Sequence, residues 1–210
     1  MSKPPAKYRV HGQTVFFPQE IQSKGTWIAT SENLFTLCLL NGADQKHEHM
    51  PPYKKSRGLV LLDFFLYNNV DRYAFEYDFK GVEPFTLIIV DCNNERRLHQ
   101  LKWDGKMVSL TDLKPFSPYI WSSATLYTDE ERAIRNDWFN EFLTLHPYIT
   151  IDNALFFHHF GGKGYTDYAI IMQRSQVQTI SITAIEATEH SKHIIYEDLI
   201  DKKCVRCHVY

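Results

Sequence analysis

Short apolar runs separated by turn residues dominate the first half of the chain. Runs of this length, bounded by Gly, Pro, Asn or Asp, predict β-strands. The run over 34–40 is apolar at nearly every position, which indicates a strand covered on both faces. The strands that this pattern predicts lie over residues 13–17, 25–30, 34–40, 85–91, 97–103 and 106–110.

Other segments carry the apolar spacing of helices. Thr128, followed by three acidic residues, predicts a helix N-terminus, because the hydroxyl caps free N–H groups and the acids complement the helix dipole. Beyond it, Ile134, Trp138, Phe142 and Leu145 share one face. The helices predicted in this way lie over residues 59–66, 69–77, 128–146 and 151–160.

The C-terminal third returns to a strand pattern. Strands are predicted over 168–172, 177–187 and 193–199, and polar and apolar residues alternate within 178–185, as in a half-buried antiparallel strand. Strands joined by hairpins, with helices grouped between them, indicate the α+β class with mainly antiparallel sheets. We expect a single domain over residues 1–210 because no linker or repeat interrupts the chain.

Composition and charge narrow the function classes. The 23 basic and 25 acidic residues leave a formal net charge of −2, which argues against nucleic acid as a partner, since that needs clustered cations. A hydrophobic fraction of 44% supplies a core and excludes general disorder. No apolar run is long enough to span a membrane, and the start, Met1-Ser2-Lys3-Pro4-Pro5, does not read as a signal peptide. Four scattered cysteines do not form a secreted disulfide framework, so a cytoplasmic location is expected.

The segment Cys204-Val-Arg-Cys207-His208 matches the pattern of covalent haem attachment and offers three potential zinc ligands. It lies close to the C-terminus, and we expect a frayed tail there instead. Histidine pairs occur at 47/49, 158/159 and 190/193, without the spacing of a metal site on a helix. We expect these to be exposed histidines, and we expect neither a bound metal nor a cofactor.

Several short motifs follow one another along nearly the whole chain. They are Gly25-Thr26-Trp27-Ile28-Ala29, Leu39-Leu40-Asn41-Gly42, Ser56-Arg57-Gly58-Leu59-Val60, Glu83-Pro84-Phe85-Thr86-Leu87-Ile88-Ile89, Trp121-Ser122-Ser123 and Val177-Gln178-Thr179-Ile180-Ser181-Ile182-Thr183. In this order the motifs resemble the NRDE family, also called the transport and Golgi organisation protein 2 family. The resemblance implies an N-terminal-nucleophile (Ntn) hydrolase-like fold, a four-layer αββα sandwich of two mainly antiparallel sheets.

The chain departs from the family pattern at its start. Relatives begin with Met-Cys-Thr, in which the Cys is the nucleophile and its α-amino group the base. Neither this Cys nor the Asn-Arg-Asp-Glu signature occurs here, so the first strand or strands are expected to be missing. Ser2 is not expected to replace the Cys, because Pro4-Pro5 cannot pair in a central strand. The expected consequence is that this chain hydrolyses no amide bond.

The resemblance also marks candidate cleft residues. Asn41 matches a position that binds the oxyanion or substrate in related hydrolases, and Ser123 stands where many relatives have Asn. Arg57 matches the family's Ser-Arg-Gly, and it serves either the site or a structural salt bridge at a helix start. Trp27, Phe35 and Trp121 are candidates to line a cleft, although core packing is the commoner role of such residues.

Two functions remain open from the sequence. The first is binding of a small apolar or amphipathic ligand in the cleft, with haem or an amide-containing compound as the candidates and a role in haem trafficking implied by the resemblance. The alternative is an Ntn-type hydrolase of C–N amide bonds whose nucleophilic Cys lies upstream of residue 1. A dimer is a further expectation, because an absent strand would leave a sheet edge unpaired.

Overall fold

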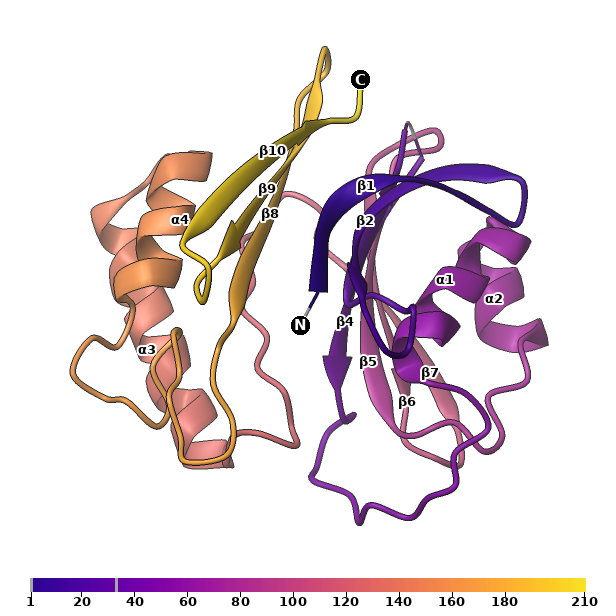
Figure 1. Cartoon of the computed structure of the whole chain (residues 1–210), viewed down its shortest axis with the longest axis horizontal. Coiled ribbons are helices and arrows are strands. Elements are labelled where there is room, and N and C mark those ends of the chain that lie inside the picture. Colours follow the sequence, from indigo (N-terminus) through magenta and orange to yellow (C-terminus); the bar gives the residue numbers. More distant parts are fainter. Residues whose placement is uncertain (1, 33) are drawn as a thin grey trace. The chain divides into compact units, whose positions relative to one another are not determined.

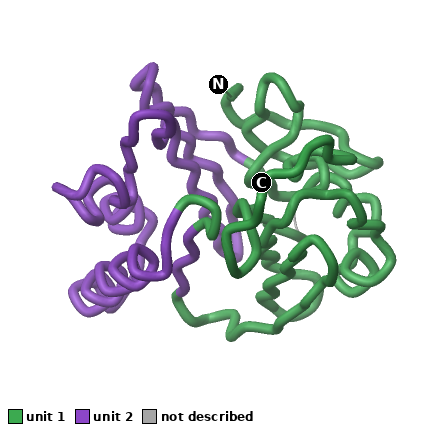
Figure 2. Tube along the Cα trace, turned by 90° about the horizontal axis from the view of Figure 1, so that it is seen from below, with its two compact units in different colours: residues 1–118, 123–126, 209–210 green, residues 119–122, 127–208 purple. Residues whose placement is uncertain are grey.

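The computed structural model describes residues 2–32 and 34–210. The chain divides into two compact units (Figure 2), with unit 1 formed by residues 1–118, 123–126 and 209–210, and unit 2 by 119–122 and 127–208. The elements in chain order are β1 (Ser2–Val10), β2 (Gln13–Glu20), β3 (Ile28–Ser31), β4 (Phe35–Asn41), α1 (Arg57–Tyr67), α2 (Val70–Glu76), β5 (Phe85–Asp91), β6 (Arg97–Trp103), β7 (Val108–Leu113), α3 (Asp129–Leu145), α4 (Ile151–Phe160), β8 (Ser181–Ala187), β9 (Lys192–Asp198) and β10 (Lys203–His208).

Unit 1 is built on a seven-stranded antiparallel sheet in which β1 to β7 follow one another in chain order. The helices α1 and α2 connect β4 to β5 and lie on one face of this sheet (Figure 1). Unit 2 has a three-stranded antiparallel sheet, ordered β10-β9-β8, beside α3 and α4. The predicted α+β class with antiparallel sheets is therefore confirmed.

The strand β1, Ser2–Val10, lies at the edge of the seven-stranded sheet and was not predicted from the sequence pattern. β1 pairs with β2 alone, and the pairing shifts in register between Lys3 and Ala6, where Pro4-Pro5 would otherwise lack donors. The prolines therefore lie at an edge, as their chemistry requires. The predicted end of the next strand at Pro18 is wrong, because β2 continues to Glu20. Pro18 falls within the register shift and outside the pairs with β3, so no ladder hydrogen bond needs its nitrogen.

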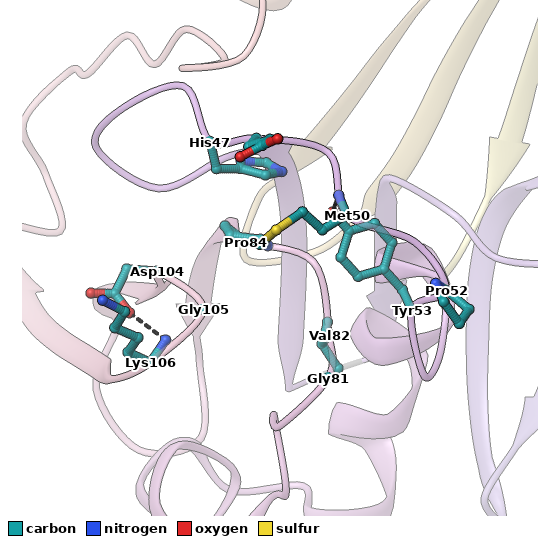
Figure 3. Close-up of a pocket in the computed structure, with 11 residues that line it drawn as sticks. His47, Met50, Pro52, Tyr53, Gly81, Val82, Pro84, Asp104, Gly105 and Lys106 are labelled. Atoms are coloured by element: carbon teal, nitrogen blue, oxygen red, sulfur yellow. Dashed lines mark hydrogen bonds between the residues drawn. The ribbon is translucent and has the colours of Figure 1, made fainter.

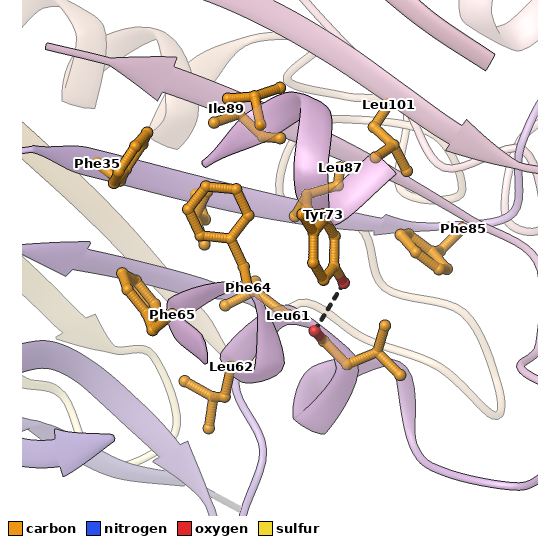
Figure 4. Close-up of a cluster of buried hydrophobic side chains, with 14 of the residues drawn as sticks. Phe35, Leu61, Leu62, Phe64, Phe65, Tyr73, Phe85, Leu87, Ile89 and Leu101 are labelled. Carbon is orange, nitrogen blue, oxygen red and sulfur yellow. Dashed lines mark hydrogen bonds between the residues drawn. The ribbon is translucent and has the colours of Figure 1, made fainter. Parts of the chain in front are cut away.

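The core of unit 1 lies between the sheet and α1 (Figure 4). Phe64 is fully buried and meets Phe35 and Tyr73 edge-on, with ring centroids 4.9 and 5.2 Å apart. The Tyr73 hydroxyl donates to the carbonyl oxygen of Val60 at 2.8 Å, which satisfies the one polar group that this ring buries. Burial raises the pKa of Tyr73 well above its ordinary value.

Full burial on β4 is limited to Phe35 and Leu37 on one face, so the prediction of a strand buried on both faces holds in part. Phe35 and Leu37 have no exposed surface, whereas Thr36, Cys38 and Leu40 on the other face are half-buried. Thr36 is partnered by Thr30 on β3, their hydroxyl oxygens lying 2.8 Å apart. The half-buried face thus carries polar and sulfur-containing side chains among its apolar ones.

Capping boxes begin both helices of unit 2. Thr128 and Glu131 cap each other's backbone at the start of α3, and Thr150 and Asn153 do the same for α4. The N-terminus predicted at Thr128 is confirmed. The predicted inward face of α3 holds for Phe142, whereas Ile134 and Leu145 are exposed.

Three predictions in unit 2 are wrong, wholly or in part. Residues 168–172 form no strand, because the carbonyl oxygens of Tyr168 and Ala169 accept hydrogen bonds from the Arg135 guanidinium at 2.8 Å instead of a neighbouring strand. The expected frayed tail is the strand β10, which pairs with β9 over its whole length. The run 177–187 is strand only from Ser181 onward.

Candidate functional site

The cysteine motif near the C-terminus lies on β10, and this placement decides its chemistry. Cys204 and Cys207 are three residues apart on one strand, so their side chains lie on opposite faces of the sheet. One haem or one zinc ion cannot bind both thiols in that geometry. His208 faces His193 across the strands, with their Nδ1 atoms 3.2 Å apart. Across residues 2–32 and 34–210, no three His, Cys, Asp or Glu side chains gather into a potential metal site.

A cavity of about 310 Å³ opens in unit 1 (Figure 3). Three segments line it: the loop after β4, the segment that leads into β5, and the turn between β6 and β7. Trp27, Phe35 and Trp121 do not line it: Phe35 lies in the core, and the other two are half-buried elsewhere. The lining residues are His47, Glu48, Met50, Pro52, Tyr53, Gly81, Val82, Pro84, Asp104, Gly105 and Lys106.

The carboxylate of Glu83 contacts three side chains, one of which, His47, lines the cavity. Oε1 of Glu83 lies 3.1 Å from Nε2 of His47 and 3.2 Å from Nδ1 of His49, while Oε2 lies 3.1 Å from Nη2 of Arg57. Burial alone would raise the pKa of Glu83, but the two histidines and the guanidinium outweigh it, and the pKa is lowered. Desolvation lowers the pKa of Arg57, opposed by the charge of Glu83. The ionised carboxylate accepts, so Nε2 of His47 carries the proton.

Two cavity residues are tied to the chain nearby. The Tyr53 hydroxyl oxygen accepts a hydrogen bond from the Met50 N–H at 2.8 Å, which fixes the ring beside the methionine. Asp104 Oδ1 accepts from the backbone N–H groups of Lys106 and Met107, each at 2.7 Å, and these bonds lower the pKa of Asp104. The Asp104 carboxylate therefore stabilises the turn between β6 and β7.

The three predicted site residues all belong to unit 1, beside this cavity but not in its lining. Ser123 Oγ donates to the Asn41 carbonyl oxygen at 2.7 Å and lies 3.0 Å from Thr125 Oγ1. Gly42, which follows Asn41 in the chain, donates its N–H to the Pro84 carbonyl oxygen at 3.0 Å. Arg57 Nη1 donates to the same oxygen at 3.2 Å. Pro84 is the residue that this network shares with the cavity.

The geometry favours one of the two roles open to Arg57. Its guanidinium is occupied by Glu83 and by the Pro84 carbonyl, the arrangement expected of a structural salt bridge at the start of α1. The roles predicted for Asn41 and Ser123 stay predictions. The contact between them joins the Asn41 backbone carbonyl to the Ser123 hydroxyl, which also lies beside the Thr125 hydroxyl.

Sequence reasoning missed the role of His47, which was expected to be an exposed histidine. Its side chain is only 17% exposed, and its Nδ1 is buried without a hydrogen-bond partner in the part of the chain that the structure describes. The signal was present in two pieces, the pair His47/His49 and the motif that begins at Glu83. Nothing in their spacing of more than thirty residues indicates that they meet.

None of the helices found in the described ranges combines the length and the apolar character that crossing a bilayer requires. The structure is similar to that of a variant of conjugated bile acid hydrolase from Clostridium perfringens, with a TM-score of 0.49 and 9% sequence identity, over 94% of this chain and 77% of that one. No curated protein is similar enough in sequence to count as a match. The family model described as Transport and Golgi organisation 2 matches residues 3–153. The chain therefore belongs to the Transport and Golgi organisation 2 family, as its sequence motifs indicated.

Proposed function

We propose that the protein binds a small amphipathic molecule in the cavity of unit 1. The observation that carries this proposal is the cavity itself: about 310 Å³, lined by apolar side chains together with the polar side chains of His47, Glu48, Asp104 and Lys106. Such a volume lies at the lower end of the roughly 300–1,000 Å³ typical of ligand sites. The apolar part of the lining is Met50, Pro52, Val82 and Pro84, with the ring of Tyr53.

The chemistry of the lining supports binding in preference to hydrolysis by a Cys, Ser or Thr nucleophile. Among the 11 residues that line the cavity, none is Cys, Ser or Thr. The hydroxyl of Ser123 contacts the Asn41 backbone carbonyl and the Thr125 hydroxyl, and neither of these groups is a general base. A nucleophile needs an adjacent base or a lowered pKa.

The size of the cavity also favours one ligand class over the other. A compact amide-containing compound suits about 310 Å³ better than the much larger haem macrocycle. The opposed thiols of β10 give no second place for haem attachment.

The test is a titration of the ¹⁵N-labelled full chain with N-phenylacetamide, followed by amide chemical shifts. We expect saturable shifts confined to residues 47–53, 81–84 and 104–106. Met50 lines the cavity and is largely exposed, so Met50→Trp should block the cavity without disturbing the core. Leu66→Trp, at an equally exposed site on α1 outside the lining, is the matched control and should bind as the wild type does. Shifts elsewhere, or binding unaffected by Met50→Trp, would contradict the proposal.

A further inference from the structure

Tyr53 has an unused hydrogen-bond donor at the cavity. Its hydroxyl oxygen accepts a hydrogen bond from the Met50 N–H. Within the described residues, the Tyr53 O–H donates no hydrogen bond of its own. A phenol can donate and accept at once, so the accepted bond leaves the proton available. Because Tyr53 lines the cavity, a ligand is positioned to accept that proton.

Lys106 supplies a second donor on the same lining. Its backbone N–H is held by Asp104, but its ammonium makes no hydrogen bond or ion pair within residues 2–32 and 34–210. The side chain belongs to an exposed turn, so its ammonium is hydrated and can reorient towards a ligand. The charge of Lys106 helps to lower the pKa of Asp104, but the two side chains form no ion pair in the described part of the chain, and the turn amides occupy only Oδ1 of the carboxylate.

The rest of the lining combines apolar side chains with the polar side chains of His47, Glu48 and Asp104. Val82 and Pro84 are buried, and Met50 and Pro52 bring further apolar surface from the opposite segment (Figure 3). Burying a donor against apolar groups without an acceptor costs free energy, so an occupant that offers an acceptor is preferred over one that does not.

From this juxtaposition, and resting on the proposed function, we infer that the ligand is an apolar molecule bearing a carbonyl-type oxygen, which accepts a hydrogen bond from Tyr53. The oxygen belongs to a neutral ketone, amide or ester, or to a carboxylate. Lys106 discriminates between these two sources, because an ammonium favours the anion. Tyr53 is thus a specificity-determining residue of the cavity.

The experiment compares two isosteric probes, 2-acetylnaphthalene and 2-isopropenylnaphthalene, which differ by a carbonyl oxygen in place of a methylene carbon. We expect the ketone to bind the wild-type chain about fivefold to tenfold more tightly, the usual effect of one hydrogen bond. Tyr53→Phe should remove this preference and leave the affinity for the hydrocarbon unchanged. The ¹⁵N spectrum of each variant verifies that it is folded.

A third probe, 2-naphthoate, separates the two sources of the oxygen. If the anion is the preferred occupant, it binds the wild type more tightly than the ketone, and Lys106→Met removes that advantage alone. If the neutral carbonyl is preferred, Lys106→Met leaves the affinity for both probes unchanged. Either result supports the role of Tyr53, provided that Tyr53→Phe weakens the preferred probe.

Equal binding of ketone and hydrocarbon by the wild type would overturn this inference and leave the proposed function standing. A preference that survives in Tyr53→Phe would also overturn it, since the acceptor would then be recognised by another group. Binding of no probe at residues 47–53, 81–84 and 104–106 would remove the proposed function together with the inference.

Discussion

Gly25 and Gly58 lie in direct backbone contact, although one precedes β3 and the other is in the first turn of α1. A Cβ atom on Gly58 would lie 2.7 Å from the nitrogen of Thr26 and 2.8 Å from its carbonyl oxygen. The Thr26 N–H also donates to the Gly58 carbonyl oxygen at 3.3 Å. This contact fixes the start of α1, and with it Arg57, against the segment that leads into the sheet.

Gly58→Ala should therefore destabilise unit 1 by about 2 kcal/mol, the usual effect of inserting a methyl group where there is no space. The better helix propensity of alanine does not offset a clash with backbone atoms, which cannot rotate away. Gly12→Ala is the control, because a Cβ there meets nothing within 4 Å while φ is +82°. It should cost about 1 kcal/mol from backbone strain alone. Urea unfolding measures both, and a loss in Gly58→Ala no larger than that in Gly12→Ala would contradict the role given to the contact.

The strongest local patterns predicted their elements to the residue. The strands at 85–91 and 97–103 and the helix at 151–160 were expected with the bounds that they have. The prediction of β5 is correct because six of its seven residues are buried and turn residues flank the strand, so the apolar pattern matches the environment. The prediction of α4 is correct because Thr150 and Gly161 cap its two ends.

The missed elements depend on neighbours that no local pattern encodes. β1 contains Pro4-Pro5 and forms because β2 offers it an edge, and β10 carries mostly polar residues and forms because β9 is beside it. The site was missed for the same reason. The contact of His47 with Glu83 joins a loop to a distant strand start, whereas Asn41, Ser123 and Arg57 were found only through the family resemblance.

A second prediction concerns two neighbouring lysines whose ion pairs differ in burial. Lys55 Nζ lies 2.5 Å from Asp63 Oδ2, which also accepts from the Tyr77 hydroxyl at 2.7 Å, and the Asp63 side chain is only 12% exposed. Desolvation, reinforced by the bond to Asp63, raises the pKa of Tyr77. Lys54 and Asp78 pair at 2.7 Å but are exposed.

Asp63→Asn should accordingly cost about 3 kcal/mol of unfolding free energy, since it removes the charge from a buried cluster. Asp78→Asn should cost less than about 1 kcal/mol. Urea unfolding of the two variants is the measurement. Similar losses in both would show that burial does not control these pairs.

Arg135 of α3 should behave as a structural guanidinium in unit 2. It donates to Ser122 Oγ as well as to the carbonyl oxygens of Tyr168 and Ala169, all at 2.8 Å, and it lies 4.2 Å from the ring centre of Tyr127. Desolvation lowers its pKa, but an arginine stays charged.

Arg135→Lys should destabilise unit 2 by about 2 kcal/mol, because an ammonium cannot reproduce the planar fork and leaves buried carbonyls unpaired. Amide hydrogen exchange around residues 168–170 should speed up in the same variant. Arg132→Lys, one turn before Arg135 on α3, where the guanidinium pairs with the exposed carboxylate of Asp129, should change both quantities much less. Unchanged exchange at 168–170 in Arg135→Lys would count against the assignment.

The cysteines should differ in reactivity according to their surroundings. Desolvation raises the pKa of the Cys38 thiol to about 11, and burial also raises the pKa of Cys207, whereas Cys204 is exposed. At pH 8 about one Cys38 thiol in a thousand is the reactive thiolate. Iodoacetamide labelling followed by peptide mapping should therefore modify Cys204 well before Cys38. Labelling of Cys38 at the rate of Cys204 would contradict this order.

Mild oxidation should not join Cys204 to Cys207, because their side chains lie on opposite faces of β10. Non-reducing peptide mapping checks this. A substantial intrachain disulfide between the two would mean that β10 is not the strand described.

The last prediction concerns the pH dependence that Glu83 imparts to unit 1. Its pKa is lowered in the folded protein by His47, His49 and Arg57, against the effect of burial. A group whose folded pKa is depressed contributes stability that is fully present above its unfolded pKa, about 4.3 for Glu, and is lost as pH falls through the folded value. In the wild type, the unfolding free energy should therefore fall as the pH drops below about 4.3.

Glu83→Gln should remove this contribution at neutral pH and flatten the acid limb of the curve, because glutamine does not titrate. The loss at pH 7 should be about 2 kcal/mol, since Arg57 is left half-buried without its carboxylate. Glu76→Gln is the matched control: the pKa of Glu76 is also lowered by an arginine, Arg72, but that pair is exposed on α2, so the curve should stay close to that of the wild type. Urea unfolding from pH 3 to pH 8 gives all three curves. A Glu83→Gln curve parallel to that of the wild type across the acid range would mean that another group carries the pH dependence.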